Sequence, residues 1–393
     1  MKYDFDRVTD RRDSNSLKWD VKENELPMWV ADMDFPTAPE IQEAILQRAR
    51  HGIFGYSIVP DEWYQAYIEW WEQRHHFSIQ REWLMFVTGV VPAVSSAVRK
   101  LTTPGEKVLI QTPVYNIFFH SIVNNGRNVL ESPLLYDGEQ YRIDFETLER
   151  DLSDPQTTMM ILCNPHNPVG KIWDRETLSE IGRLCAKHHV TVLSDEIHCD
   201  LTAPGKEYVP FASVSEACRE NSVTCIAPTK AFNLAGLQTA AIVVPGEALR
   251  NKMYRAINTD EVAEPNAFAV QATVAAFTEG GPWLDELRGY LEENRRLVKQ
   301  YLEAELPKLH LVKAEATYLL WIDCREMPGS ASVFARFLRE AAGLYLSGGA
   351  QYGDAGSDFL RLNMACPRSV LMEGLKRLKK GMAEYENWIL ANC

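Results

Sequence analysis

The sequence contains no C-x-x-C pair, although it has eight cysteines in 393 residues. Structural zinc sites and dithiol redox centres usually need such closely spaced pairs. Several of the cysteines fall in apolar, strand-like runs, where free thiols are commonly buried. We therefore expect reduced, buried thiols, with neither a disulfide framework nor a metal site. The cysteines are Cys163, Cys185, Cys199, Cys218, Cys225, Cys324, Cys366 and Cys393.

Long apolar runs, blocks of like charge and internal repeats are also missing. No apolar run approaches the roughly 20 residues that a membrane-spanning helix needs. The first residues, MKYDFDRVTDRRDSNS, are charged and lack the apolar core of a signal peptide. The formal charge of −13 is spread along the chain, without a basic patch. We therefore expect a cytoplasmic protein that neither enters a membrane nor binds nucleic acid.

The sequence does contain enough apolar residues for a large core, since 46% are hydrophobic and 10% aromatic. From about residue 83, short apolar runs alternate with amphipathic stretches that are typical of helices. Strands separated by helices in this way indicate βαβ units with helices on both faces of a parallel sheet. The sequence thus predicts an α/β fold with a doubly wound, mostly parallel sheet. The strand-like runs are WLMFVT, KVLIQT, TMMILC, VTVLSDE, SVTCIAP and TAAIVVP.

The pattern changes after Ala263, where two long helices are predicted on either side of Gly280, Gly281 and Pro282. The remainder alternates strand-like ATYLLWIDC and DFLRLNMA with helix-like SVFARFLREAAG and a last helix from about Ser369. The length of the chain also favours more than one domain. We expect a smaller α+β domain at the C-terminal end.

Polar residues follow four of the predicted strands at the points where they end. GVVPA follows WLMFVT, NPHNPVG follows TMMILC, VTVLSDE ends in Asp195 and Glu196, and PTK follows SVTCIA. Alone, each could be a turn or a helix cap. Because doubly wound sheets bind ligands at the carboxyl ends of their strands, we expect one shared site. Together these residues offer a lysine, an acid, polar donors and a helix N-terminus, which is the set that pyridoxal phosphate needs.

The order and spacing of these motifs resemble the fold type I pyridoxal-phosphate enzymes, the class I/II aminotransferase superfamily, from about Ala31 to Arg361. NPHNPVG, SDEIH and APTKAFNLAGLQ are similar, in particular, to the branch of cystathionine β-lyase-like C–S lyases. The resemblance implies pyridoxal 5′-phosphate as cofactor and an amino acid as substrate. It also implies an N-terminal segment over residues 1–45 that joins the small domain and covers the active site, a large cofactor-binding domain over 46–280, and a small domain over 281–393.

Carried onto this sequence, the resemblance implies that Lys230 forms the Schiff base with the cofactor and that Asp195 keeps the pyridinium nitrogen protonated. Asn167 would bind the 3-hydroxyl oxygen of the cofactor. Tyr115 would stack on the ring beside the reacting atoms, with Ile197 on the opposite face. For Tyr115 and Ile197, plain core packing is the alternative.

The phosphate group is expected at TGVVPA, where Gly89 precedes a helix and the amides of Val90 and Val91 point out of its N-terminus. Thr229 would add a hydroxyl group. Tyr56, in GIFGYSIVP, resembles a tyrosine that the family sends to the phosphate of a neighbouring subunit. The resemblance thus implies a homodimer with shared active sites, and a packed loop aromatic is the alternative for Tyr56.

The substrate is expected to contact Arg361, Asn167 and Ala31. Arg361, in FLRLNMACPRS, resembles the arginine that receives the substrate α-carboxylate, for which its planar fork is suited. A surface charge on a strand is the alternative. Ala31 lies in WVADMDFPTAPEI, which resembles the segment that covers the substrate in the family.

Three positions depart from the typical aminotransferase. His198 stands where a tyrosine is usual, Gln238 where an arginine neutralises the phosphate, and Ala227 where a serine is usual. His198 is still expected beside the cofactor. These departures are as expected for the C–S lyase branch, and they favour elimination over transamination.

The sequence therefore predicts a β-lyase that converts L-cystathionine or cysteine S-conjugates to pyruvate, ammonia and a thiol. An aminotransferase, including one for aromatic amino acids, is the first alternative. A cofactor-bearing protein whose task is to bind a regulator is the second.

Overall fold

The structure, a computed structural model, describes residues 2–392. Its centre is a seven-stranded sheet in which β10 pairs antiparallel with both neighbours and the other pairs are parallel. The predicted doubly wound, mostly parallel sheet is confirmed. The strand order is β2 (Leu84–Val87), β10 (Ala240–Val243), β9 (Ser222–Ile226), β8 (Thr191–Asp195), β7 (Thr157–Cys163), β3 (Lys107–Ile110) and β4 (Asn128–Glu131).

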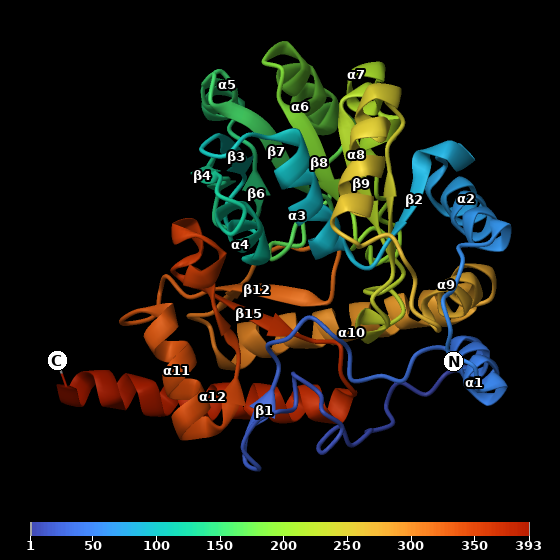
Figure 1. Cartoon of the computed structure of the whole chain (residues 1–393). Helices are drawn as coiled ribbons and strands as arrows, with labels where there is room; N and C mark the ends of the chain where they lie inside the picture. The colour runs from blue at the N-terminus through green and yellow to red at the C-terminus, as the bar shows by residue number, and fades with distance from the viewer. Residues whose placement is uncertain (1, 393) are drawn as a thin grey trace.

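Helices cover both faces of this sheet (Figure 1). Along β7, Met159 and Ile161 join one apolar core, whereas Met160 and Leu162 join another on the opposite face. Because both faces are buried, these strands are continuous apolar runs rather than alternating ones. The first core includes α3 (Val90–Leu101), α4 (Ile117–Val123) and α8 (Glu247–Thr259), and the second includes α5 (Phe145–Leu152), α6 (Arg175–Lys187) and α7 (Glu216–Glu220).

A four-stranded antiparallel sheet lies below the large one in Figure 1. Its strand order is β11 (His310–Leu311), β12 (Leu319–Asp323), β15 (Phe359–Asn363) and β14 (Ser347–Gly348). α10 (Gly281–Glu305) and α11 (Ala331–Ala342) pack on it, and α12 (Arg368–Asn392) packs on these two helices. This arrangement agrees with a smaller α+β unit towards the C-terminal end.

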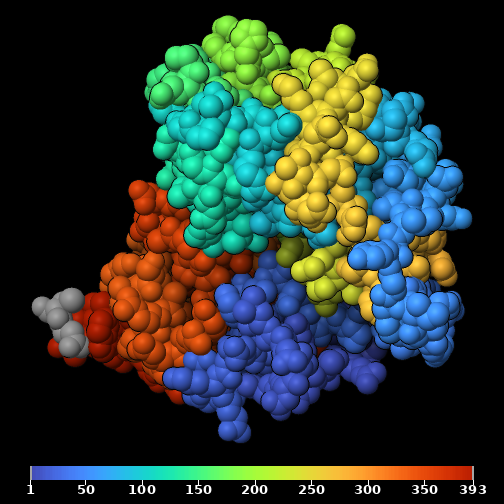
Figure 2. All heavy atoms as spheres, in the orientation of Figure 1, coloured from blue at the N-terminus to red at the C-terminus, as the bar shows by residue number. Residues whose placement is uncertain are grey.

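The N-terminal residues join this second unit. β1 (Leu26–Pro27) pairs in parallel with β13 (Leu344–Tyr345). In Figure 2 the blue N-terminal segment lies across the face shown, between the orange and red C-terminal unit and the helices of the large sheet. The exact division at residues 45 and 280 stays a prediction.

The remaining elements are short or lie at the edge of the large sheet. α1 (Pro39–His51) and α2 (Asp61–His75) both pack on α9 (Ala269–Thr278), and β5 (Leu135–Tyr136) pairs with β6 (Tyr141–Arg142). Single 3-10 turns occur at Arg81–Trp83, Phe211–Ser213, Ala235–Leu237, Gly349–Tyr352 and Asp354–Gly356.

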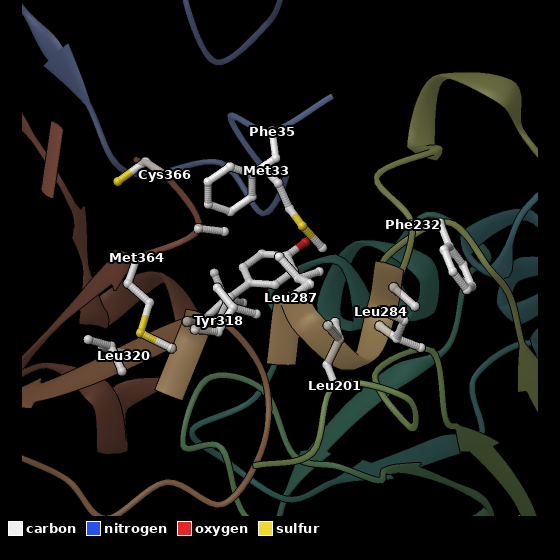
Figure 3. Close-up of a cluster of buried hydrophobic side chains, with 14 of the residues drawn as sticks. Met33, Phe35, Leu201, Phe232, Leu284, Leu287, Tyr318, Leu320, Met364 and Cys366 are labelled. Atoms are coloured by element: carbon white, nitrogen blue, oxygen red, sulfur yellow. The ribbon is translucent and has the colours of Figure 1, made fainter. Parts of the chain in front are cut away.

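An apolar cluster joins the N-terminal segment to both units (Figure 3). Met33 and Phe35 come from the N-terminal segment. Leu201 lies in the loop after β8, Phe232 in the loop after β9, and Leu287 in α10. Each of these side chains is at most 3% exposed. The segment is therefore held by burial of apolar surface as well as by strand pairing.

Among the described residues, no helix is long and apolar enough to cross a membrane. The cysteines from Cys163 to Cys366 are buried and form no disulfide, in agreement with the expectation of reduced thiols. Cys393 lies outside the described residues.

Truncating Leu287 to alanine should destabilise the protein by about 2–5 kcal/mol, because Leu287 is fully buried and the cavity left behind cannot close completely. Leu46→Ala is the matched control, since Leu46 is 48% exposed, and it should change stability by about 0.5 kcal/mol or less. Urea denaturation followed by fluorescence measures both. Equal midpoints for the two variants would contradict the role given to the cluster.

Candidate active site

A cavity of about 240 Å³ lies at the carboxyl ends of the central strands. Residues that follow β2, β7, β8 and β9 meet there, as ligand sites of doubly wound sheets do. All of the predicted site residues except Tyr56 and Arg361 line it. The lining residues are Ala31, Thr88, Gly89, Val90, Val91, Pro92, Tyr115, Cys163, Asn167, Asp195, Ile197, His198, Thr229, Lys230, Ala235, Gln238 and Thr239.

Lys230 extends from the loop after β9 and donates a hydrogen bond from Nζ to the carbonyl oxygen of Ala31 at 2.6 Å. Burial lowers the pKa of the amine to about 8; the Arg361 guanidinium adds to this effect, while Asp32 and Asp195 oppose it. An amine with this pKa is partly neutral near pH 7.5 and can act as a nucleophile or as a base.

Asp195 ends β8 and is only 4% exposed. Its Oδ1 accepts a hydrogen bond from the amide of Ile197 at 3.1 Å. Burial raises the pKa of this carboxyl to about 6, against the opposing effects of the Ile197 amide and of Lys230. The carboxylate is therefore mostly ionised at neutral pH, and its incomplete solvation makes it a strong partner for a cationic group in the cavity.

His198 contributes a neutral imidazole. Burial lowers its pKa to about 3, and the charges of Lys230 and Arg361 act in the same direction. Its Nδ1 is buried and has no hydrogen-bond partner among the described residues. Burying a polar atom without a hydrogen bond destabilises the folded protein, so this nitrogen is well placed to bond a ligand in the cavity.

Tyr115 remains a neutral phenol. Burial raises its pKa to about 12, while Arg361 acts in the opposite direction. Its ring meets Phe118 edge-on at 5.7 Å, and both Tyr115 and Ile197 border the core that includes α3. Tyr115 and Ile197 therefore pack against the core and line the cavity at the same time.

One end of the cavity is suited to an anion. α3 begins after Gly89, whose lack of a side chain leaves the first amides of the helix uncapped. Thr229 and Gln238 line the same cavity, and Gln238 adopts a left-handed conformation with φ 51°. Backbone N–H groups at a helix N-terminus, together with the helix dipole, favour a phosphate or carboxylate.

Arg361 lies in β15 and is 5% exposed, so the alternative of a solvated surface charge is wrong. Nη1 donates to Asn167 Oδ1 at 3.2 Å, and Nη2 donates to the carbonyl oxygen of Trp29 at 2.9 Å. The guanidinium lies 4.8 Å from the ring centroid of Tyr352. Its Nε is buried without a partner among the described residues, which leaves capacity for a ligand.

Tyr56 lies outside the cavity of its own chain and is completely exposed, at 103%. The alternative of a packed loop aromatic is therefore wrong. What Tyr56 contacts in an assembly stays a prediction.

Sequence reasoning missed two side chains beside the cavity. Tyr318 donates from its hydroxyl to the carbonyl oxygen of Ala31 at 2.9 Å and meets His198 edge-on at 6.3 Å. Asn363 binds the backbone on both sides of Ala31. Both residues belong to apolar strand runs, so their only sequence signal was that of core residues.

A second group of polar side chains lies where the end of α2 meets the loop after β8. His75, Cys199 and Asp200 place possible ligand atoms within 4.8 Å of one another. His75 Nε2 is already 2.9 Å from Asp200 Oδ1, and Arg74 and Arg288 line the same cavity of about 270 Å³. Because nearby cations disfavour a metal ion, the group is better described as a network that joins α2 to this loop.

The aminotransferase class I and II family matches residues 24–378. The chain belongs to this family. It is 43% identical over 385 residues to "Cystathionine beta-lyase PatB" of Bacillus subtilis (strain 168), and the matched region covers 96% of this chain and 100% of the relative.

Solved structures are similar as well. Cystalysin from Treponema denticola, whose crystal structure contains pyridoxal 5′-phosphate, has a TM-score of 0.95 at 34% identity, over 98% of this chain and 100% of that one. A pyridoxal-phosphate-bound C–S lyase from Staphylococcus hominis has a TM-score of 0.90 at 31% identity, over 97% and 98% of the two chains. The predicted family and its branch are confirmed.

The lowered pKa of Lys230 predicts an unusual pH dependence for acetylation of the cofactor-free protein. Only the neutral amine reacts, so Lys230 should be half-maximally reactive near pH 8, whereas an exposed lysine should approach this point only near pH 10.4, about its ordinary pKa. Quantitative peptide mass spectrometry measures both in one sample. Reactivity of Lys230 that still climbs between pH 9 and 10 would contradict the lowered pKa.

Proposed function

We propose that the protein is a pyridoxal-phosphate-dependent carbon–sulfur β-lyase that acts on L-cystathionine or cysteine S-conjugates and releases pyruvate, ammonia and a thiol. The observation that carries the proposal is a lysine amine of lowered pKa, in one cavity with the buried Asp195 carboxylate and the neutral His198 imidazole. The similarity to cystathionine β-lyases and C–S lyases along the whole chain supports the same activity.

The residues around the cavity fit pyridoxal phosphate. The uncapped start of α3 suits its phosphate, and the Asp195 carboxylate suits a protonated ring nitrogen. The unpaired Nδ1 of His198 and the amide of Asn167 provide polar partners near the ring. When bound, the cofactor supplies an electron-accepting ring that takes up the electron pair left at Cα after deprotonation.

The protein's own groups then have separate tasks. Lys230, once its amine is neutral, accepts the Cα proton of the substrate. Asp195 stabilises positive charge at the far end of the cavity, while Tyr115 and Ile197 exclude water on either side. Arg361, whose Nε is unpaired and whose Nη1 bonds Asn167, binds the substrate carboxylate together with the backbone at Ala31.

Elimination is favoured over amino transfer by His198 and Gln238, which replace the tyrosine and arginine usual in aminotransferases. The family is named for aminotransferases, so amino transfer is the second candidate. The two activities differ in one requirement: a lyase releases pyruvate without a 2-oxo acid, and an aminotransferase needs one.

Purified holoenzyme given L-cystathionine, without any 2-oxo acid, should release pyruvate. Lys230→Ala should lower the rate by at least about 100-fold, because general base catalysis at Cα is lost. Lys299→Ala, at a residue whose side chain is 64% exposed, is the control and should retain the rate. A lactate dehydrogenase-coupled assay measures pyruvate. Product formation only in the presence of a 2-oxo acid would identify an aminotransferase instead.

We also propose a homodimer in which Tyr56 completes the phosphate site of the neighbouring chain. Residues around Tyr56 form an unusually apolar exposed arm, with Ile53 69%, Phe54 56% and Ile58 80% exposed. An apolar surface of this kind is typical of a protein–protein interface. Tyr56 itself reaches away from its own chain, which supports a contact with another.

Tyr56→Phe should weaken cofactor binding about tenfold to hundredfold, because a hydrogen bond to a charged group contributes roughly 1.5–3 kcal/mol. Mixed dimers of Tyr56→Phe and Lys230→Ala chains have one site that keeps both native residues. At that site the cofactor should bind as tightly as in the wild type, as measured by absorbance titration. Weak binding in the mixed dimers would mean that Tyr56 serves its own chain.

The cytoplasm remains our proposal for the location of the protein, and the buried free thiols from Cys163 to Cys366 support a reducing compartment. We likewise propose that the chain divides into domains at residues 45 and 280, with β1 tying the N-terminal segment to the small domain.

A further inference from the structure

The carbonyl oxygen of Ala31 is the direct neighbour of the Lys230 amine. It accepts one hydrogen bond from Lys230 Nζ at 2.6 Å and another from the Tyr318 hydroxyl at 2.9 Å. A backbone carbonyl has two lone pairs, so both are used. A neutral amine that donates one N–H to this oxygen can no longer rotate freely, and its own lone pair is directed away from Ala31.

Asn363 holds the peptide groups on both sides of Ala31. Its Nδ2 donates to the carbonyl oxygens of Val30 and Asp32, both at 2.6 Å. Its Oδ1 accepts the amide N–H of Ala365 at 2.8 Å, which fixes the orientation of the side-chain amide. The side chain is buried, with the residue only 1% exposed, so water does not compete for these bonds.

Successive carbonyl groups of the N-terminal segment accept hydrogen bonds from different side chains. Those of Val30 and Asp32 turn to Asn363, whereas that of Ala31, between them, turns to Lys230. Arg361, two residues before Asn363 on the same face of β15, holds the preceding carbonyl of Trp29 at 2.9 Å. β15 therefore sets the orientation of the segment one peptide group at a time.

We infer that Asn363 is a positioning residue of the active site: by binding the carbonyl groups that flank Ala31, it presents the Ala31 carbonyl to Lys230 and fixes the reacting amine in the cavity. The inference deepens the proposed function and rests on it only in taking Lys230 as the reacting group. Asn363 acts through the backbone and touches no reacting atom itself.

The same segment also brings charge to the amine. Arg361, Asp32 and Asp195 are the charged groups that act on Lys230. The Asp32 carboxylate is itself fixed by Arg11, with Nη1–Oδ1 3.0 Å and Nη2–Oδ2 2.8 Å. Release of the segment would therefore admit water to the amine and loosen one of its charged neighbours at once.

Asn363→Ala tests the inference, with Asn294→Ala as the matched control. Asn294 is also fully buried, and its Nδ2 also donates to two carbonyl oxygens, those of Met364 and Cys366, both at 3.1 Å. Its Nδ2 thus makes two bonds of the same kind, but to carbonyl groups outside residues 29–32. A loss of stability common to buried asparagines will therefore occur in both variants.

The first readout is acetylation of Lys230 in the cofactor-free protein, which requires no turnover. Burial is the largest cause of the lowered pKa of Lys230, so in Asn363→Ala the pH of half-reaction should rise from about 8 towards that of an exposed lysine. In Asn294→Ala it should stay at the wild-type value. Equal curves for the wild type and both variants would overturn the inference.

The second readout is kcat of the holoenzyme for pyruvate release, which should fall about tenfold to hundredfold in Asn363→Ala but little in Asn294→Ala, because misplacement of a reacting group has an effect of this size. If Asn363→Ala does not fold, Asn363→Thr, which suits a strand but cannot bind two carbonyls with N–H groups, must give the same shift in acetylation. Absence of pyruvate in the wild type would refute the lyase proposal, while the acetylation result would still decide the role of Asn363.

Discussion

Burial of the Lys230 amine lowers its proton affinity, and much of the surrounding structure preserves that burial. The amine emerges at the end of a sheet, a position that solvent would reach if the N-terminal segment did not cover it. The segment is held at three kinds of contact: apolar packing of Met33 and Phe35, pairing of β1 with β13, and hydrogen bonds from β15. A chain end far from Lys230 in sequence thus sets the chemistry of its side chain.

Two adjacent acids, Asp195 at the end of β8 and Glu196 directly after it, have different surroundings and different tasks. Asp195 faces the cavity, whereas Glu196, the next residue, accepts bonds from the Ser194 hydroxyl at 2.7 Å and the Phe211 amide at 2.9 Å, and also from the Tyr208 hydroxyl. Burial raises the pKa of Glu196 to about 8. One acid can therefore serve the ligand, while the other, which is not part of the cavity lining, holds the loop that carries Tyr208 and Phe211.

The fold and the meeting of polar residues at the strand ends could be predicted from local patterns, whereas the roles of single residues at the cavity were implied by the resemblance to the family. Each central strand is a short apolar run, and the polar residues that follow the runs are brought together by the topology of the sheet itself. The supports of the site could not be predicted in this way. Asn363 bonds residues 333 and 331 positions away, and Tyr318 is separated from Ala31 by 287 positions. In the sequence both are simply members of buried strands, and only the folded chain shows which carbonyl groups they meet.

The contact between Ala31 and Lys230 has a consequence for the evolution of the site. Because position 31 offers its main-chain oxygen, a change of side chain there leaves the acceptor in place. The hydrogen bond to Lys230 therefore depends on the backbone at position 31 and not on the side chain there. We expect the selective constraint from this hydrogen bond to fall instead on Asn363, which we infer to orient the peptide from another part of the chain.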